Sequence, residues 1–132
     1  MLGSEEDALK MVNKLKETAA KTPFEMTDLA ETTQLLLNYG ITADEVTDKI
    51  MMLGDIAQGD SQKMQRVATA FGQMSSAGKV SLEDVKQMIE AGYNPLQEIS
   101  ESTGETMESL YDRISKGTLT VDEITASMER ST

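Results

Sequence analysis

The sequence contains no cysteine, histidine or tryptophan, and it has only two phenylalanines and three tyrosines among 132 residues. Without cysteine the chain has neither a disulfide nor a thiolate metal site. Without histidine it lacks a Ser-His triad and the commonest metal ligand. No GxxxxGK[ST] or GxGxxG pattern occurs, so no phosphate-binding loop is indicated. These absences predict that the protein is not an enzyme and has no catalytic, cofactor-binding or metal-binding residues.

Positive charge is scarce as well, because the formal net charge is -11 at pH 7. Binding to DNA or RNA requires clustered lysine and arginine that release counterions from the phosphates. An acidic surface also repels anionic membranes, and no run approaches the roughly 18 apolar residues that a membrane span requires. We therefore expect neither nucleic acid nor membrane to be a partner of this segment.

Carboxylates are the main chemical groups that remain. A two-carboxylate glycosidase is disfavoured, because no tryptophan can stack on a sugar ring and the acidic residues fall at helix starts or on polar helix faces. A calcium loop of the EF-hand kind, centred on Gly78 or Gly117, is a further alternative. It is disfavoured because Ala77, Ile114 and Lys116 would occupy positions that need oxygen ligands.

Apolar residues recur at helical spacings of three and four along nearly the whole chain, as in Ala8, Val12, Leu15 and Ala19. No stretch alternates with a period of two, so no sheet is expected. The pattern predicts an all-α fold, a compact array of about eight short helices joined by glycine-capped turns. We place these helices near residues 5–21, 27–38, 43–58, 61–77, 82–91, 95–103, 107–116 and 121–130.

Glycine, proline and capping residues between the apolar segments support these boundaries. Glycines follow six periodic segments, where a left-handed cap favours a residue without Cβ, at Gly40, Gly59, Gly78, Gly92, Gly104 and Gly117. Pro23 and Pro95 suit the first turn of a helix. At three joints an apolar residue, a hydroxyl residue and an acid follow in the order of a hydrophobic staple and a capping box, at Ile41-Thr42-Ala43-Asp44-Glu45, Val80-Ser81-Leu82-Glu83-Asp84 and Leu119-Thr120-Val121-Asp122-Glu123.

Four residues inside the helix predicted over 43–58 invite specific interpretations. Gly54 is expected to admit the close approach of a neighbouring helix. Asp55 is expected to be solvated, the alternative being a bond to a partner's backbone. Met51 is expected on the outer face beside a core-facing Met52. The chain has ten methionines, which form either a pliable core or an adaptable contact surface.

Several blocks of the sequence resemble the N-terminal region of phage tail tape measure proteins. They are LLLNYGITADEV (35–46), MLGDIAQG (52–59), FGQM (71–74), AGKVSLEDV (77–85) and IEAGYNPL (89–96). The likeness extends over about Phe24 to Met128. It implies a structural segment of a tape measure protein from a phage or a prophage, with no active site in this region.

The resemblance also implies where the protein works and with what. Tape measure proteins occupy the tail lumen during assembly, and their length sets the length of the tail. The implied partners are tail tube and tail assembly proteins and assembly chaperones, and self-association is left open. The implied location is the virion tail, assembled in the cytoplasm of the bacterial host.

We expect residues 1–22 to form an N-terminal helix that could be the end of a longer upstream helix, and residues 23–132 to form the tape-measure-like domain. The last apolar stripe, Val121, Ile124 and Met128, ends without a glycine or proline stop, which suggests an excised fragment. The competing interpretation is a free-standing acidic helical adaptor that binds a partner protein.

Overall fold

The computed structural model describes residues 5–21 and 24–132, and within these ranges it contains eight helices and no strand. The helices are α1 (Glu5–Lys21), α2 (Met26–Asn38), α3 (Ala43–Ala57), α4 (Ser61–Ala77), α5 (Leu82–Ala91), α6 (Pro95–Thr103), α7 (Met107–Lys116) and α8 (Val121–Arg130). The predicted all-α class is confirmed, and every boundary lies within one residue of its predicted place. Pro95 begins α6 as expected, whereas Pro23 lies outside the described residues.

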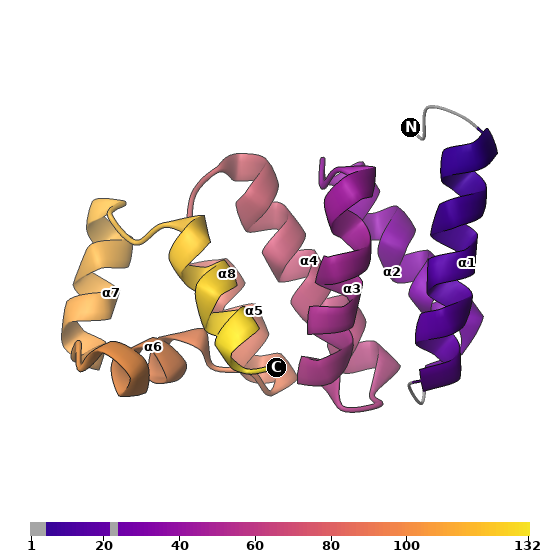
Figure 1. Ribbon diagram of the computed structural model, residues 1–132. Coiled ribbons are helices and arrows are strands. Elements are labelled where there is room, and N and C mark those ends of the chain that lie inside the picture. Colours follow the sequence, from indigo (N-terminus) through magenta and orange to yellow (C-terminus); the bar gives the residue numbers. More distant parts are fainter. Residues whose placement is uncertain (1–4, 22–23) are drawn as a thin grey trace.

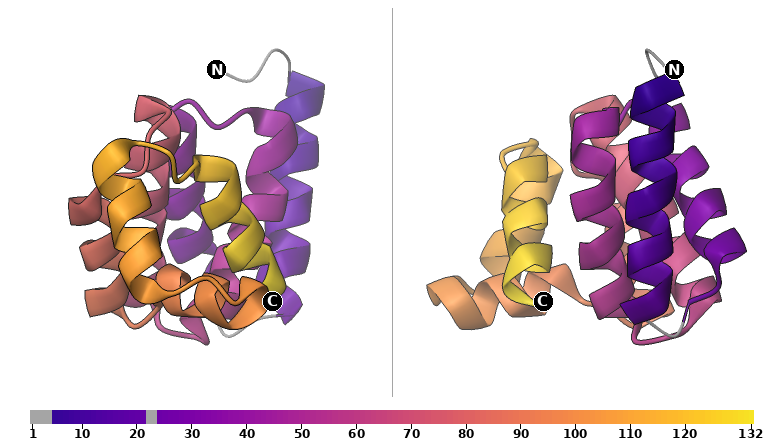
Figure 2. Two further views of the ribbon diagram at one scale, coloured as in Figure 1. Left: turned by 90° about the vertical axis from the view of Figure 1, so that its left-hand side faces the viewer. Right: turned by 45° about the vertical axis from the view of Figure 1, so that its right-hand side comes forward.

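The helices form an elongated array with α1 at one end and α7 at the other (Figure 1). At the first end α1 packs on α2 and α3, and both of these pack on α4. The second half follows through α5, which packs along α4 and contacts α6 and α7. Helix α8 then contacts α6 and returns to α3, so that segments far apart in the sequence close the array. Figure 2 shows the same arrangement from two further sides.

The helix ends explain why the turns are short. All six glycines predicted to end helices have positive φ angles, a conformation that costs a residue without Cβ little. Gly78 and Gly117 are themselves the C-caps of α4 and α7. At the end of α3 the left-handed cap is Gln58, with φ 52°, and Gly59 follows it.

The helix starts agree with the prediction in part. The Ser81 and Thr120 hydroxyl oxygens each accept a hydrogen bond of 3.1 Å, from the backbone N–H of Asp84 and Glu123 respectively. Thr42 stands at the N-cap of α3 without such a bond, so the predicted cap interaction is wrong there. In a capping box the acid would accept from the backbone N–H of the cap residue, and neither acid does so. The Asp84 carboxylate instead accepts from the Ser81 hydroxyl at 2.8 Å, and Glu123 accepts from Arg113 of α7.

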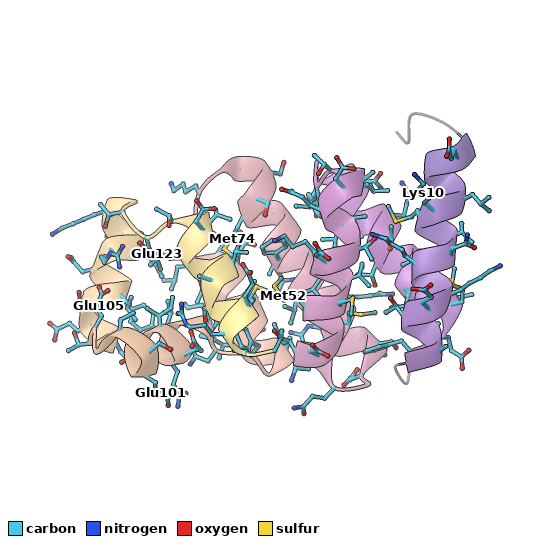
Figure 3. The ribbon with its side chains drawn as sticks, viewed as in Figure 1. Lys10, Met52, Met74, Glu101, Glu105 and Glu123 are labelled. Carbon is cyan, nitrogen blue, oxygen red and sulfur yellow. The ribbon has the colours of Figure 1, made fainter. Side chains whose placement is uncertain are left out.

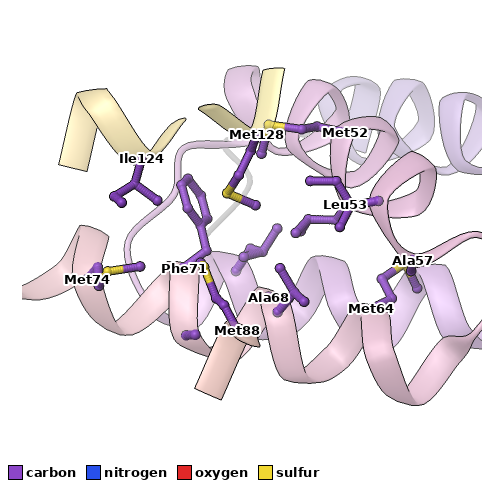
Figure 4. Close-up of a cluster of buried hydrophobic side chains, with 14 of the residues drawn as sticks. Met52, Leu53, Ala57, Met64, Ala68, Phe71, Met74, Met88, Ile124 and Met128 are labelled. Carbon is purple, nitrogen blue, oxygen red and sulfur yellow. The ribbon is translucent and has the colours of Figure 1, made fainter. Parts of the chain in front are cut away.

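Aliphatic and thioether side chains form the core, and Figure 4 shows the central part of it. Six methionines are buried, namely Met11, Met52, Met64, Met74, Met88 and Met128. Phe71, also buried, lies among them. Met51 is 50% exposed, as predicted for the outer face of α3. The methionines are therefore mainly core residues rather than a contact surface.

The buried face of α1 differs from the predicted stripe. Met11, Leu15 and Thr18 are buried, whereas Val12 is 39% exposed, so placing Val12 in the stripe was wrong. The reason is the position of α3, whose Thr47 hydroxyl donates to the Met11 sulfur at 3.5 Å. Position 12 lies about 80° around the helix from the centre of a face formed by Met11 and Leu15.

Close backbone packing occurs at Gly72 rather than at Gly54. A Cβ added at Gly54 would lie 3.5 Å from the ring of Phe24, an ordinary contact with a residue that precedes α2. The prediction that Gly54 admits a neighbouring helix is therefore wrong. At Gly72 an added Cβ would lie 2.8 Å from Cγ of Tyr39 and closer still to Cδ2. The end of α2 thus rests on the backbone of α4.

Candidate interaction surface

The acidic side chains do not gather into a metal site. Among the described residues no group of three or more aspartates and glutamates is placed to hold a metal ion. Only residues 78–81 separate α4 from α5, whereas an EF-hand requires a loop of about twelve residues. At the other candidate joint Asp112 lies inside α7, where it pairs with Lys116 at 3.0 Å. Neither joint has the geometry of a calcium loop.

Arg113 forms a polar cluster around α7 with Glu105 and Glu123, both of which Figure 3 labels. Its Nη1 donates to Oε1 of Glu105 at 2.9 Å. Its Nη2 donates to Oε1 of Glu123 at 2.7 Å and to the carbonyl oxygen of Thr118 at 3.2 Å. The hydrogen bond to Glu123 is the largest cause of the raised pKa of Arg113. The cluster ties α7 to the turns on both of its sides and to α8, which is a structural role.

A second polar cluster holds α8 on α6. Arg130 donates from Nε and Nη2 to the two carboxylate oxygens of Glu98, at 2.9 and 2.8 Å. These bonds are the main reason that the pKa of Glu98 is lowered to about 2. The Tyr93 hydroxyl lies 2.8 Å from the Ser127 hydroxyl and 3.0 Å from that of Ser131, and burial raises the pKa of Tyr93.

The other side of α8 faces α3 across a less polar contact. Within the described part of the chain no hydrogen bond or ion pair joins α8 to α3. Instead Met128 of α8 lies beside Met52 of α3 in the core (Figure 4). Helix α8 is therefore fixed by polar groups on one side and by apolar packing on the other.

Two adjoining hollows of about 700 and 290 Å³ follow this contact, and we call them together the seam groove. Facing stripes line the groove, with Glu45, Lys49 and Met52 from α3 and Asp122, Thr125 and Glu129 from α8. Lys49 lines both hollows, so they are neighbours along α3. Phe71 and Leu119, both buried, line the larger hollow and make part of its lining apolar.

Negative charge dominates the edges of the seam groove. Five exposed carboxylates lie along it, at Glu45, Asp48, Asp55, Asp122 and Glu129. None of the five is in an ion pair with another described residue. Lys49 and Lys79 are the basic residues that line the groove. The predicted exposure of Asp55 is confirmed.

Sequence reasoning missed this groove. Helical spacing could have identified each stripe by itself, since Glu45, Lys49 and Met52 share one face of α3. The pairing of that face with α8 depends on the return of the chain from α7, for which the sequence has no local signal. Met51, an exposed methionine of α3, lines the smaller hollow, and its expected exposure was the signal that the sequence offered.

The whole chain, residues 1–132, matches the sequence profile of the tape measure protein family. The chain belongs to this family. The match confirms the resemblance seen in the sequence blocks. Membership in the family implies that this tape measure segment is a phage tail component, and the family is structural rather than catalytic. No curated protein and no solved structure is significantly similar to it. None of the helices described for this tape measure segment is long and apolar enough to cross a membrane.

Proposed function

We propose that the chain is a structural, non-catalytic segment of a tail tape measure protein that takes part in tail assembly and in setting tail length. The match to the tape measure family over all of residues 1–132 carries this proposal. We also propose that residues 23–132 are the tape-measure-like domain and residues 1–22 an N-terminal helix. The arrangement of the polar groups supports a structural role, because Arg113 and Arg130 connect helices to one another.

The proposal includes the partners and the location of the segment. Its partners are tail tube and tail assembly proteins, including assembly chaperones, and its location is the virion tail after assembly in the host cytoplasm. The net charge of -11 supports a segment that does not bind the DNA sharing the tail lumen. Tight binding to duplex DNA at physiological salt would contradict this part of the proposal.

The first test is an immunoblot of purified phage tails, or of an induced-prophage lysate, with an antibody raised against this chain. A band far larger than 14.4 kDa that sediments with tails is expected. A soluble band near 14.4 kDa that is absent from particles would refute the proposal and favour a free-standing helical adaptor.

The second test is an in-frame deletion of residues 24–132 in the encoding phage, with tail length measured by electron microscopy. Drawn out as one helix, the 109 deleted residues would span about 160 Å at 1.5 Å per residue. Shorter tails, or none, are expected. Tails of normal length would contradict a role in setting tail length, and a normal number of tails would contradict a role in tail assembly. Replacement with an unrelated helical segment of equal length is the control, because it restores length without restoring the specific surface.

A further inference from the structure

We propose that the seam groove binds a basic amphipathic helix of a partner protein. The groove is a feature of the folded chain whether or not the segment sets tail length, so the binding test below and the tail-length test can fail independently. Its shape, its lining and its charge each point to this occupant.

The shape of the groove suits a helix. Helices α3 and α8 run in the same direction along it, because the larger hollow touches Glu45 and Asp122 and the smaller one touches Asp55 and Glu129. Together the two neighbouring hollows follow α3 from position 45 to position 55, which is about 15 Å or almost three turns. A helix laid in such a groove presents anchoring residues at spacings of three, four and seven.

The lining of the groove gives such anchors an apolar surface that can adjust. Met51 is 50% exposed at the smaller hollow, and Met52 lies beneath it. Unbranched thioether side chains reshape easily around different partners. Since no described hydrogen bond or ion pair fixes α3 to α8, small shifts at this contact break no polar interaction.

The charge of the groove selects a basic occupant. Its five carboxylates outnumber its two lysines, and no arginine lines the groove to neutralise them. The arginines of the chain, Arg66, Arg113 and Arg130, are all in ion pairs with carboxylates that do not line the groove. Lysines or arginines on the edges of a partner helix would supply the missing positive charge, and their attraction would weaken with salt.

The probe is a synthetic amphipathic peptide of three to four helical turns, with leucine on one face and lysine on the other. Isotope-labelled chain is titrated with the peptide and followed by two-dimensional NMR. We expect shift changes concentrated in α3 and α8, and an affinity at least tenfold weaker at high salt. A peptide with glutamate in place of lysine should not bind.

Matched variants distinguish binding at the groove from general attraction of the peptide to an acidic protein. The test variant removes three groove carboxylates, Asp48→Asn, Asp55→Asn and Glu129→Gln. The control removes three exposed carboxylates from other faces, Glu17→Gln, Glu83→Gln and Glu101→Gln. We expect at least a tenfold loss of affinity in the test variant and less than a twofold change in the control, with both retaining the helical circular dichroism of the parent.

A second pair of variants tests the apolar anchor. Met51→Ala should weaken peptide binding several-fold, whereas Leu9→Ala, at a side chain 61% exposed on α1, should not. Equal weakening by both charge variants, or shift changes spread over the whole surface, would reduce the binding to non-specific attraction and overturn the proposal. Self-association of the chain alone that the Met51→Ala variant abolishes would make a second copy the occupant and would overturn it as well.

Discussion

Replacing Gly72 with alanine tests how firmly the end of α2 is held on α4. The added Cβ would lie 2.8 Å from Cγ and 3.2 Å from Cβ of Tyr39. These atoms are at the base of the tyrosine side chain, so a movement of the ring tip cannot relieve the clash. Either the side chain must leave its rotamer or α2 must move away from α4.

The expected magnitude follows from two opposing effects. Overpacking of a close contact costs about 1–3 kcal/mol. Alanine is better than glycine inside a helix by about 1 kcal/mol. The Gly72→Ala variant should therefore lower the free energy of unfolding by up to about 2 kcal/mol. Gly54→Ala is the control, because its Cβ meets Phe24 at an ordinary 3.5 Å and should raise that free energy by up to about 1 kcal/mol.

Urea unfolding followed by circular dichroism measures both changes. In a Tyr39→Ala background the contacts with Cγ and Cδ2 are gone and only the 3.2 Å approach to Cβ of residue 39 remains, so Gly72→Ala should there stabilise the chain by up to about 1 kcal/mol. The double-mutant cycle should show a coupling of about 2 kcal/mol between the two positions. The same penalty in both backgrounds, or a higher urea midpoint for the single Gly72→Ala variant, would refute this account of the contact.

Three further predictions concern caps, charge and core. Ser81→Ala should cost about 1 kcal/mol in urea unfolding because it removes a cap hydrogen bond, whereas Thr42→Ala should cost much less because Thr42 makes none. Glu98→Gln should destabilise by about 1 kcal/mol at pH 7, a value reduced for solvent exposure. Because the folded pKa of Glu98 is lowered to about 2 from 4.5, that difference should be present above pH 4.5 and vanish as the pH falls to about 2. Met88→Ala, at a fully buried site, should cost about 2–5 kcal/mol in thermal or urea unfolding, and a loss below 1 kcal/mol would contradict the described core.

The helices could be predicted closely because each has local signals at both ends. The stop at Gly78 and the start at Ser81 lie only three positions apart, and each is decided by conformational preferences that need no tertiary contact. Apolar spacing then fixes which face is buried only approximately. On α1 it selected Val12 instead of Met11, because the choice between adjacent apolar positions depends on where α2 and α3 lie.

Contacts between distant segments could not be predicted from local signals. The contact between Tyr39 and Gly72 joins the end of α2 to the middle of α4. The sequence around a glycine does not indicate which distant residue will pack against it. The acid at Glu123 matched a capping box, yet its Oε1 accepts from Nη2 of Arg113 at 2.7 Å. Both partners of that bond are charged, whereas a capping box would offer the carboxylate a neutral backbone N–H. The seam groove is missed for the same reason, because it exists only where α8 returns to α3.

The turns of this fold bear on the length that the segment can contribute to a tail. A single continuous helix would place six glycines, which here have positive φ, inside the helix at a cost of about 1 kcal/mol each relative to alanine. It would also expose the core, where each large apolar side chain contributes about 1.5–3 kcal/mol. The core therefore opposes extension far more than the glycines do. If the segment is drawn out in the lumen, a partner must cover its apolar faces. If no partner does so, the segment stays folded, and deletion of residues 24–132 should shorten the tail by much less than about 160 Å.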